Sequence, residues 1–427
     1  MTEQIVLQEP KELLTVKPQL FTEIKKLGAF DVTACMNCGV CTASCPLSVS
    51  GNEFPRKLIR YAILGLKDKV LSRPEPWLCY YCGDCSQTCP SQADPGRFMT
   101  AVRRYAIIEY SIGKIGKIFS SRSSAIISYM ILALLGIVGI ILGLLFLMDP
   151  NLPPFWDLTF TPYSFNSYRL ISYDFIHYSG MFLSAVIFGI AFIHGLIMLN
   201  YLTKGSRTPS DVSIFKKIFS IIIGFIKIAI GEGIFEKSFN KCDSKARYFS
   251  HMAIFYGYVL TFISTLFMFI ADMILTLNLP ALLGIDSYLF YHENVKPFSK
   301  VFGFVGGILL IVGAGYYVYI RMVKKDEYSE HSHFSDWDFL LLTLVIGLTG
   351  FFMDVFIGLD WLFTDLGIVS SLQIPVLMLA YLGYAIHLVL VFILIMAAAF
   401  TKFAHMEYRL LAIWYNEYQK LVIPSSF

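Results

Sequence analysis

The stretch CMNCGVCTASCP at residues 35–46 returns with the same spacing as CYYCGDCSQTCP at residues 79–90. Each stretch has three cysteines separated by two residues, then a fourth cysteine after three more residues, then proline. Runs of this spacing hold [4Fe–4S] clusters through their soft thiolate ligands. Eight of the nine cysteines are therefore predicted to bind two clusters, and the chain is predicted to transfer electrons.

The fourth cysteine of each run is predicted to cross to the other cluster, as it does in two-cluster ferredoxins. The proline after it suits this arrangement, because proline ends a helix and turns the chain away. The predicted ligands are Cys35, Cys38, Cys41 and Cys89 for cluster 1, and Cys79, Cys82, Cys85 and Cys45 for cluster 2.

Structural zinc and disulfides are the alternatives for these cysteines. A zinc site usually needs only two Cys-x2-Cys pairs, and the repeated triple cysteine with Cys-Pro exceeds that pattern. Cysteines two or three residues apart rarely meet disulfide geometry. The topology described below also predicts a reducing compartment for this domain, where disulfides are rare.

The chain is too apolar for an ordinary soluble protein. Its 427 residues are 56% hydrophobic and 15% charged, with a mean hydropathy of +0.62, whereas soluble proteins carry about 25% charged residues. An apolar run of about 20 residues is long enough to cross a bilayer as a helix. The predicted spans are residues 124–148, 175–201, 249–275, 298–320, 339–357 and 374–400.

The distribution of charge predicts the topology. The loops before the first span, between the second and third, between the fourth and fifth, and after the sixth are rich in Lys and Arg, which stay on the cytoplasmic side. We therefore expect an inner-membrane protein with both termini in the cytoplasm. Lysines recur within the apolar residues 214–235, which predicts a helix lying on the cytoplasmic membrane surface.

The predicted fold class is mainly α, with a small ferredoxin-type helical domain holding two [4Fe–4S] clusters followed by a six-helix transmembrane cytochrome b bundle. The predicted domains are a polar arm at residues 1–30, the two-cluster domain at residues 31–110 and the membrane domain at residues 111–427.

Histidines at the spans are functional candidates, because ionisable residues in a membrane are costly. His387 and His405 are eighteen residues apart at the last span. On one continuous helix they would share a face about 27 Å apart. His251 begins the third span at the cytoplasmic edge, and His177 begins the second at the outer edge. Since facing helices can supply two imidazoles to an electron-transfer haem, we predict an inner haem b on His251 and His405 and an outer haem b on His177 and His387.

The alternative for these histidines is ordinary hydrogen bonding in a helical core. It is the favoured interpretation for His194, which lies about 100° around the second span from His177. Three cations near the predicted inner haem, Arg247, Lys402 and Arg409, are predicted to pair with its propionates. Anchoring the spans as cytoplasmic positive charges is the alternative role for them.

Further stretches resemble a known family. FPRK at 54–57, GLKD at 65–68 and WLCYYCGDC at 77–85 resemble the HdrC-like module of heterodisulfide reductases. Together with RYFSHMAIFYG at 247–257 and KFAHMEYR at 402–409, the fusion to a NarI/HdrE-like cytochrome b resembles the QmoC family, the membrane subunits of the quinone-interacting membrane-bound oxidoreductases of sulfate-reducing prokaryotes.

The resemblance implies a quinone-linked oxidoreductase subunit that acts only within a complex. Members of this family exchange electrons with menaquinone through b haems. Their clusters connect to QmoA-like and QmoB-like flavoprotein and iron–sulfur subunits, which serve adenylylsulfate reductase in dissimilatory sulfate reduction. The NarI-like cytochromes that the chain resembles often place two histidines about ten residues apart on one helix, and this chain departs from that pattern because Thr261 stands at the second position.

Three other functions remain open from the sequence. The same architecture could serve another heterodisulfide-reductase-type complex with a different soluble partner. An ion-pumping transporter with a ferredoxin appendage is disfavoured, because the spans carry few acidic residues, chiefly Asp272 and Asp354. A non-catalytic membrane anchor would contain no haem. Residues of a quinone site cannot be identified from the sequence, because such pockets are mostly apolar.

Overall fold

The computed structural model describes residues 15–48, 53–146, 154–155, 165–204, 219, 223–224, 231, 245–276, 295–323, 332–365 and 373–422. Within these residues all regular secondary structure is helical, which confirms the predicted mainly α fold. By its contacts the chain forms two compact units. Unit 1 holds the described residues of Met1–Lys114, Ile193–Phe235 and His405–Phe427, and unit 2 those of Ile115–Phe192 and Glu236–Ala404.

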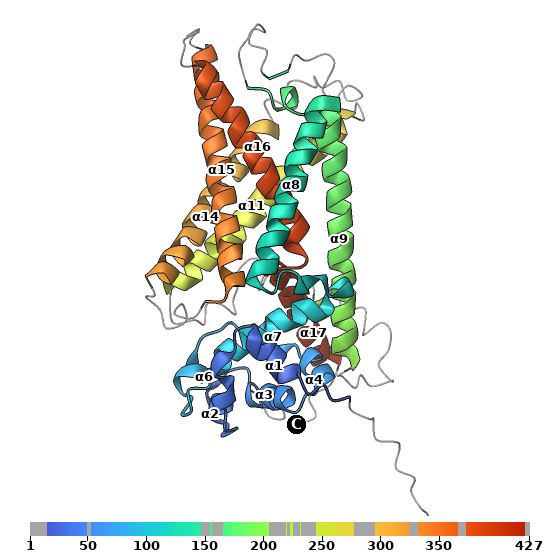
Figure 1. The fold of residues 1–427 in the computed structure, drawn as a ribbon, viewed down its shortest axis with the longest axis vertical. Helices are drawn as coiled ribbons and strands as arrows, with labels where there is room; N and C mark the ends of the chain where they lie inside the picture. Colours follow the sequence, from blue (N-terminus) through green and yellow to red (C-terminus); the bar gives the residue numbers. More distant parts are fainter. Residues whose placement is uncertain are drawn as a thin grey trace, which may run out of the picture. The chain divides into compact units, whose positions relative to one another are not determined.

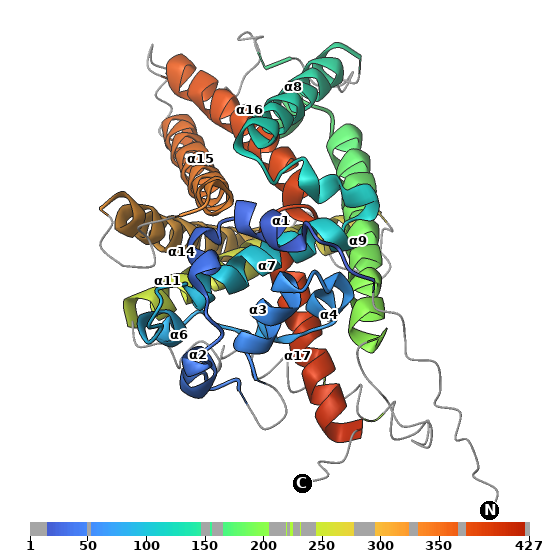
Figure 2. The ribbon, with the colours of Figure 1, turned by 60° about the horizontal axis from the view of Figure 1, so that its bottom comes forward.

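Unit 1 contains the two cysteine runs among short helices, several of which are labelled in Figure 2. Its first segment forms α1 Leu20–Lys26, η1 Phe30–Ala34, α2 Val40–Ser44, α3 Arg56–Ile63, α4 Lys67–Leu71, α5 Glu75–Leu78, α6 Asp84–Gln87 and α7 Pro95–Tyr110. The predicted polar arm therefore includes a helix. Leu20 and Ile24, four residues apart, share one face of α1 and are fully buried where α1 contacts α3 and α7.

Unit 1 also takes two segments from far along the chain. These are the last residues of α9 (Tyr173–Lys204) and most of α17 (Ala404–Val422). The backbone N–H of Ile112 donates to Nε2 of His194 at 3.0 Å, and the Tyr415 hydroxyl donates to the carbonyl of Leu202 at 2.8 Å. The cluster domain is thus joined to the end of the helix that carries the second predicted span, and that end in turn contacts the helix that follows the sixth.

Unit 2 contains most of the apolar helices (Figure 1). The described residues include six helices long and apolar enough to cross a membrane, the same number of candidates as predicted: Arg122–Leu145 in α8, Asp174–Lys204 in α9, Lys245–Leu275 in α11, Lys296–Met322 in α14, Phe334–Asp360 in α15 and Gln373–Ala398 in α16. The full helices are α8 Arg122–Phe146, α11 Lys245–Thr276, α14 Lys296–Met322, α15 Phe334–Asp365 and α16 Gln373–Ala398. The surface helix predicted at 214–235 lies outside the described residues, apart from isolated positions.

Helix packing in unit 2 runs in series, from α11 to α14, α15, α16 and α8 (Figure 1). The α11–α14 contact is made by small residues. A Cβ added to Gly306 would lie 2.9 Å from the carbonyl oxygen of Gly257, so the two backbones nearly touch. Ser264 donates to the carbonyl of Ser299 at 2.8 Å across the same contact. Such small and hydroxylated residues are typical of interfaces between helices in membranes.

The last span does not continue straight into the helix that carries His405. α16 ends at Ala398 and α17 begins at Ala404. Between them, Phe400 N–H donates to the carbonyl of Ala397, and Ala404 N–H to that of Thr401, which are turns of three residues rather than α-helical bonds. The assumption of one continuous helix was wrong, and the predicted separation of about 27 Å between His387 and His405 no longer follows.

Candidate functional site

The two cysteine runs adopt the same backbone conformation. Asn37 and Tyr81, at equivalent positions, both have φ of 57°, and the glycines two residues later, Gly39 and Gly83, have φ of 91° and 97°. Left-handed conformations disfavour residues with a Cβ, so their repetition at matching positions marks a duplicated motif. Each glycine directly precedes a short helix, α2 or α6, and these two helices contact each other.

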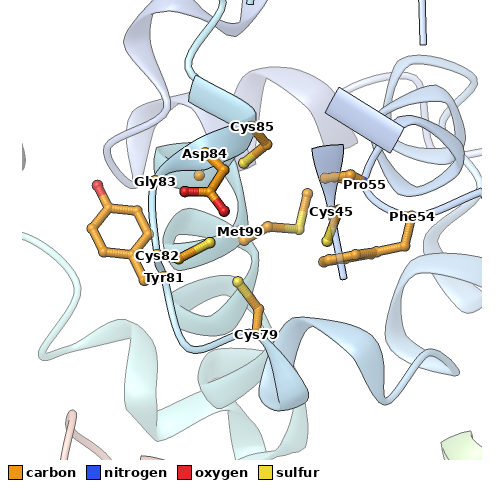
Figure 3. A pocket seen from close by; sticks show the side chains of 11 residues that line it. Cys45, Phe54, Pro55, Cys79, Tyr81, Cys82, Gly83, Asp84, Cys85 and Met99 are labelled. Atoms are coloured by element: carbon orange, nitrogen blue, oxygen red, sulfur yellow. The ribbon is translucent and has the colours of Figure 1, made fainter. Parts of the chain in front are cut away.

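A pocket opens beside the second run (Figure 3). Its empty space is about 320 Å³ including the part open to solvent, and the lining residues are Cys45, Phe54, Pro55, Cys79, Tyr81, Cys82, Gly83, Asp84, Cys85, Gly96 and Met99. The four cysteines among them are the predicted ligands of cluster 2, including Cys45 from the first run. Four soft donors in a largely apolar pocket fit an iron–sulfur cluster.

The thiols of this pocket interact with one another. Burial raises the pKa of Cys85, and the neighbouring Cys79, Cys45 and Cys82 raise it further. Burial also raises the pKa of Cys45 and of Cys82 to about 11 in each case. Without a metal these thiols would therefore stay protonated at neutral pH. A bound cluster supplies the positive charge that stabilises their thiolate form.

The other predicted ligand set shows the same pattern. Burial raises the pKa of Cys41, and the neighbouring thiols of Cys35, Cys89 and Cys38 raise it further. Cys89 comes from the second run, so a thiol of each run lies among the thiols of the other. Cys41 is buried and Cys38 is exposed, which makes the cluster 1 side the more open one at that ligand.

Hydrogen bonds order the chain after the second run. The backbone N–H of Ala93 donates to the sulfur of Cys89 at 3.4 Å. Ser86 donates to Oδ1 of Asp94 at 2.6 Å and accepts from the N–H of Gly96 at 3.0 Å. Because a Cβ on Gly96 would lie 2.8 Å from the Ser86 hydroxyl, this close approach needs glycine. Donors to ligand sulfurs are one of the means by which a protein sets a cluster's potential.

An aromatic cluster lies directly before Cys79. Trp77 is 1% exposed, and its ring centroid is 5.1 Å from that of Tyr408, 5.7 Å from His405 and 6.4 Å from Tyr110. This cluster was not predicted from the sequence, although a tryptophan two residues before a predicted ligand was an available signal. The contact brings His405, a predicted haem ligand, beside the segment that carries a predicted cluster ligand.

Two arginines hold the backbone of the same segment. Arg103 donates through Nε to the carbonyl of Pro76 at 2.6 Å and through Nη2 to the carbonyl of Cys79. Arg409 donates through Nη1 to the carbonyl of Trp77 at 2.8 Å. Burial lowers the pKa of Arg103 to about 10, with Cys79 opposing the shift and Arg409 adding to it, so Arg103 remains cationic at neutral pH.

His387 of α16 contacts two residues of α15. Its Nδ1 lies 3.1 Å from Oγ1 of Thr349, and that hydroxyl donates to the carbonyl of Val345 at 2.8 Å. The hydroxyl can therefore accept a hydrogen bond from Nδ1–H of His387, and the haem-ligand role of this histidine stays a prediction. A Cβ on Gly350 would lie 3.1 Å from the ring, so this glycine gives His387 room.

The other predicted haem ligands occupy different parts of the chain. His177 of α9 stacks on Phe269 of α11, with ring centroids 5.9 Å apart. His251 of α11 belongs to unit 2, whereas His405 belongs to unit 1. Both haem pairings therefore stay predictions. His194 is fully buried and accepts the Ile112 N–H bond described above, as expected of a hydrogen-bonded core residue.

The cations predicted to bind propionates have protein contacts in the structure. Lys402 binds Oδ1 of Asp336 at 2.6 Å. Arg247 lies in the first turn of α11, and its carbonyl accepts the hydroxyl of Tyr317 at 2.9 Å. Arg409 binds Trp77 as described. The propionate role of all three stays a prediction.

Comparison with known proteins identifies the N-terminal part of the chain. Residues 31–93 match the family described as the 4Fe-4S dicluster domain. These residues form a two-cluster iron–sulfur domain. The match includes all eight cysteines of the two runs, from Cys35 to Cys89.

The curated relatives match in the same part. A protein of Archaeoglobus profundus, named as similar to the C subunit of heterodisulfide reductase, is 49% identical over 55 residues, 13% of this chain and 29% of the relative. The C subunit of the H(2):CoB-CoM heterodisulfide,ferredoxin reductase of Methanothermobacter thermautotrophicus is 42% identical over 59 residues, 13% of this chain and 30% of the relative. The chain thus spans less than a third of the length of these relatives. No solved structure matches the chain.

Proposed function

We propose that this chain is the membrane electron-transfer subunit of a quinone-linked oxidoreductase complex. The observation that carries the proposal is the presence of a two-cluster domain and six candidate membrane spans in one chain. A soluble carrier needs no such helices, and a membrane anchor needs no clusters. Their fusion supports a path for electrons between a lipid-soluble carrier and a soluble protein.

The proposed donor is menaquinol, which yields two electrons and two protons when it is oxidised to menaquinone. Two b haems, when bound, would take these electrons one at a time. His251 and His405 would ligate the inner haem, and His177 and His387 the outer. Thr349 would orient the His387 ring through Nδ1, a support that metal-bound histidines usually have. Arg247, Lys402 and Arg409 are the proposed propionate partners.

The proposed acceptors are cytoplasmic. Lys and Arg concentrate in the loops on the side of the cluster domain, which favours an inner-membrane protein with that domain and the C-terminus in the cytoplasm. The proposed partners are QmoA-like and QmoB-like subunits, and through them adenylylsulfate reductase in dissimilatory sulfate reduction. The likeness to the C subunits of heterodisulfide reductases supports partners of this class.

A different heterodisulfide-reductase-type complex is the second candidate. It is favoured by the Methanothermobacter relative, whose name gives a heterodisulfide and ferredoxin reductase. The two candidates share the clusters and differ in the soluble partner. Purification of the complex from its native membrane, followed by identification of the bound subunits, distinguishes the two candidate functions.

A reduced-minus-oxidised optical spectrum of the purified chain tests the membrane part of the proposal. We expect two b haem components in a redox titration. His251→Ala and His405→Ala should each remove the same component, and His177→Ala and His387→Ala the other, because loss of one of two axial ligands releases the haem. His333→Ala serves as the control, since His333 contacts Ser335 two residues away. A spectrum without haem would refute the quinone-linked function.

A further inference from the structure

The backbone before cluster 2 is held by two guanidinium groups from distant helices. Arg103 of α7 bonds the carbonyls of Pro76 and Cys79, and Arg409 of α17 bonds the carbonyl of Trp77, which lies between them. Arg103 is partly buried. Two guanidinium groups thus donate hydrogen bonds to three carbonyls of residues 76–79, a segment that ends at the predicted ligand Cys79.

Positive charge at this place affects the cluster electrostatically. Reduction adds an electron to a group that its thiolates already make negative, so a nearby cation favours the reduced form and raises the potential. Partly buried charges are screened less than charges in water. The charge of Arg103 acts on Cys79 in particular, because Nη2 of Arg103 donates to the carbonyl of this ligand.

The cluster 1 side differs in exposure. Its ligand Cys38 is exposed, and the neighbouring Met36 and Val40 are 68% and 40% exposed. Its nearby cation is Arg56, whose Nη1 would lie 3.3 Å from a Cβ on Gly39. An exposed ligand flanked in the chain by two exposed apolar side chains is suited to contact with another redox protein. By contrast, Trp77 beside cluster 2 is covered by Tyr408 and His405 of α17.

We propose that Arg103 and Arg409 are positioning residues that fix Cys79 against α17 and raise the reduction potential of cluster 2. In this arrangement cluster 2 is the inner cluster and cluster 1 is the outer one. The inference rests on the proposed function in one respect, namely that electrons reach the clusters from the side of α17. The inner cluster is the one whose ligand segment contacts His405 through the ring of Trp77. The outer cluster is the one whose ligand Cys38 is exposed and can face the soluble partner.

Electron paramagnetic resonance during redox titration of the full-length protein tests the proposal. Cys38→Ser and Cys82→Ser first assign the signals of clusters 1 and 2, because each replaces a ligand of one cluster. Arg103→Gln and Arg409→Gln should then lower the midpoint potential of the cluster 2 signal and leave that of cluster 1 unchanged. Arg56→Gln is the matched control and should shift only the cluster 1 signal.

Two variants separate charge from geometry. Arg103→Lys keeps the charge, so its cluster 2 potential should stay close to that of the wild type, whereas Arg103→Gln should not. If Arg103→Gln fails to assemble a cluster, Arg409→Gln still reports the effect of charge at the neighbouring carbonyl. The proposal would be overturned if Arg103→Gln or Arg409→Gln shifted the potential of cluster 1. It would also be overturned if these variants left the potentials of both clusters unchanged.

Exposure provides the second measurement. A water-soluble paramagnetic chelate should speed the relaxation of the cluster 1 signal more than that of cluster 2. Equal effects, or a stronger effect on cluster 2, would contradict the assigned order. Both measurements use cluster signals alone, so a protein without haem would refute the proposed function and still give a result on the order of the clusters.

Discussion

Cys45 is a single residue at which the predicted crossing of ligands between the two clusters can be tested. It belongs to the first run by sequence but lines the pocket of the second. Cys45→Ser should therefore lose cluster 2 and retain most of cluster 1, since Cys35, Cys38, Cys41 and Cys89 stay intact. Paramagnetic resonance combined with iron content measures this. Preferential loss of cluster 1 would show that the ligands do not cross.

Glu109 ties α4 to the end of α7 and predicts a pH dependence. Its carboxylate contacts Lys67 at 2.6 Å and Lys114 at 3.2 Å. Burial alone would raise the pKa of Glu109, but these lysines outweigh it and lower the pKa below its ordinary value. A lowered pKa in the folded state stabilises the protein above the unfolded pKa of about 4.3, and this contribution is lost as the pH falls through the folded pKa.

Glu109→Gln should lower stability at pH 7 by about 1.5–3 kcal/mol, the contribution of a hydrogen bond to a charged group. The difference from the wild type should shrink as the pH falls below about 4. Thermal unfolding of the detergent-solubilised protein at several pH values measures both. Glu23→Gln, which breaks the more exposed pair with Lys17, is the control and should cost less than about 1 kcal/mol. A pH-independent loss in Glu109→Gln would contradict the electrostatic explanation.

At the scale of elements, the α11–α14 contact depends on which glycine faces the neighbouring helix. A Cβ at Gly306 would meet backbone and side-chain atoms of α11 within 3.0 Å, whereas one at Gly307 would meet nothing within 4 Å. Gly306→Ala should therefore destabilise unit 2 by about 1–3 kcal/mol through overpacking. Gly307→Ala should be neutral or slightly stabilising, because alanine suits a helix better than glycine. Thermal unfolding compares the adjacent variants, and equal effects would contradict the packing.

Most elements were predictable because their signals are local. The spacing of the cysteines is sufficient for the two-cluster domain, and a run of about 20 apolar residues is sufficient for a span. The assignment of the cysteines to the two clusters stays a prediction, and it is supported by the pocket that Cys45 shares with Cys79, Cys82 and Cys85.

The parts that were not predicted depend on contacts between distant segments. Arg103 and Arg409 resemble ordinary basic residues near a membrane, and only the fold brings their guanidinium groups to the Trp77 segment. The break between α16 and α17 contains no proline or glycine, so the usual helix-breaking signals were missing. The helix α1 was overlooked because its charged residues conceal the apolar pair of Leu20 and Ile24.

At the scale of the whole molecule, the topology predicts an electrical effect of turnover. His177 is expected at the outer edge of the second span, and menaquinol oxidised near it would release protons outside while electrons pass inward. Vesicles containing the protein, a menaquinol donor and a water-soluble one-electron acceptor on the cluster side should therefore develop a membrane potential, positive on the other side. A potential-sensitive dye measures it. Turnover without a potential would contradict the outer quinol site and leave electron transfer itself unaffected.

The partnership of Trp77 with α17 also has a consequence for biosynthesis. Trp77 and Arg409 are 332 positions apart in the chain. At a translation rate of about 5–20 residues per second, the cysteine runs leave the ribosome roughly 15–65 s before the helix that covers Trp77. Iron delivery to both runs therefore has an interval of this length in which Tyr408, His405 and Arg409 do not yet exist.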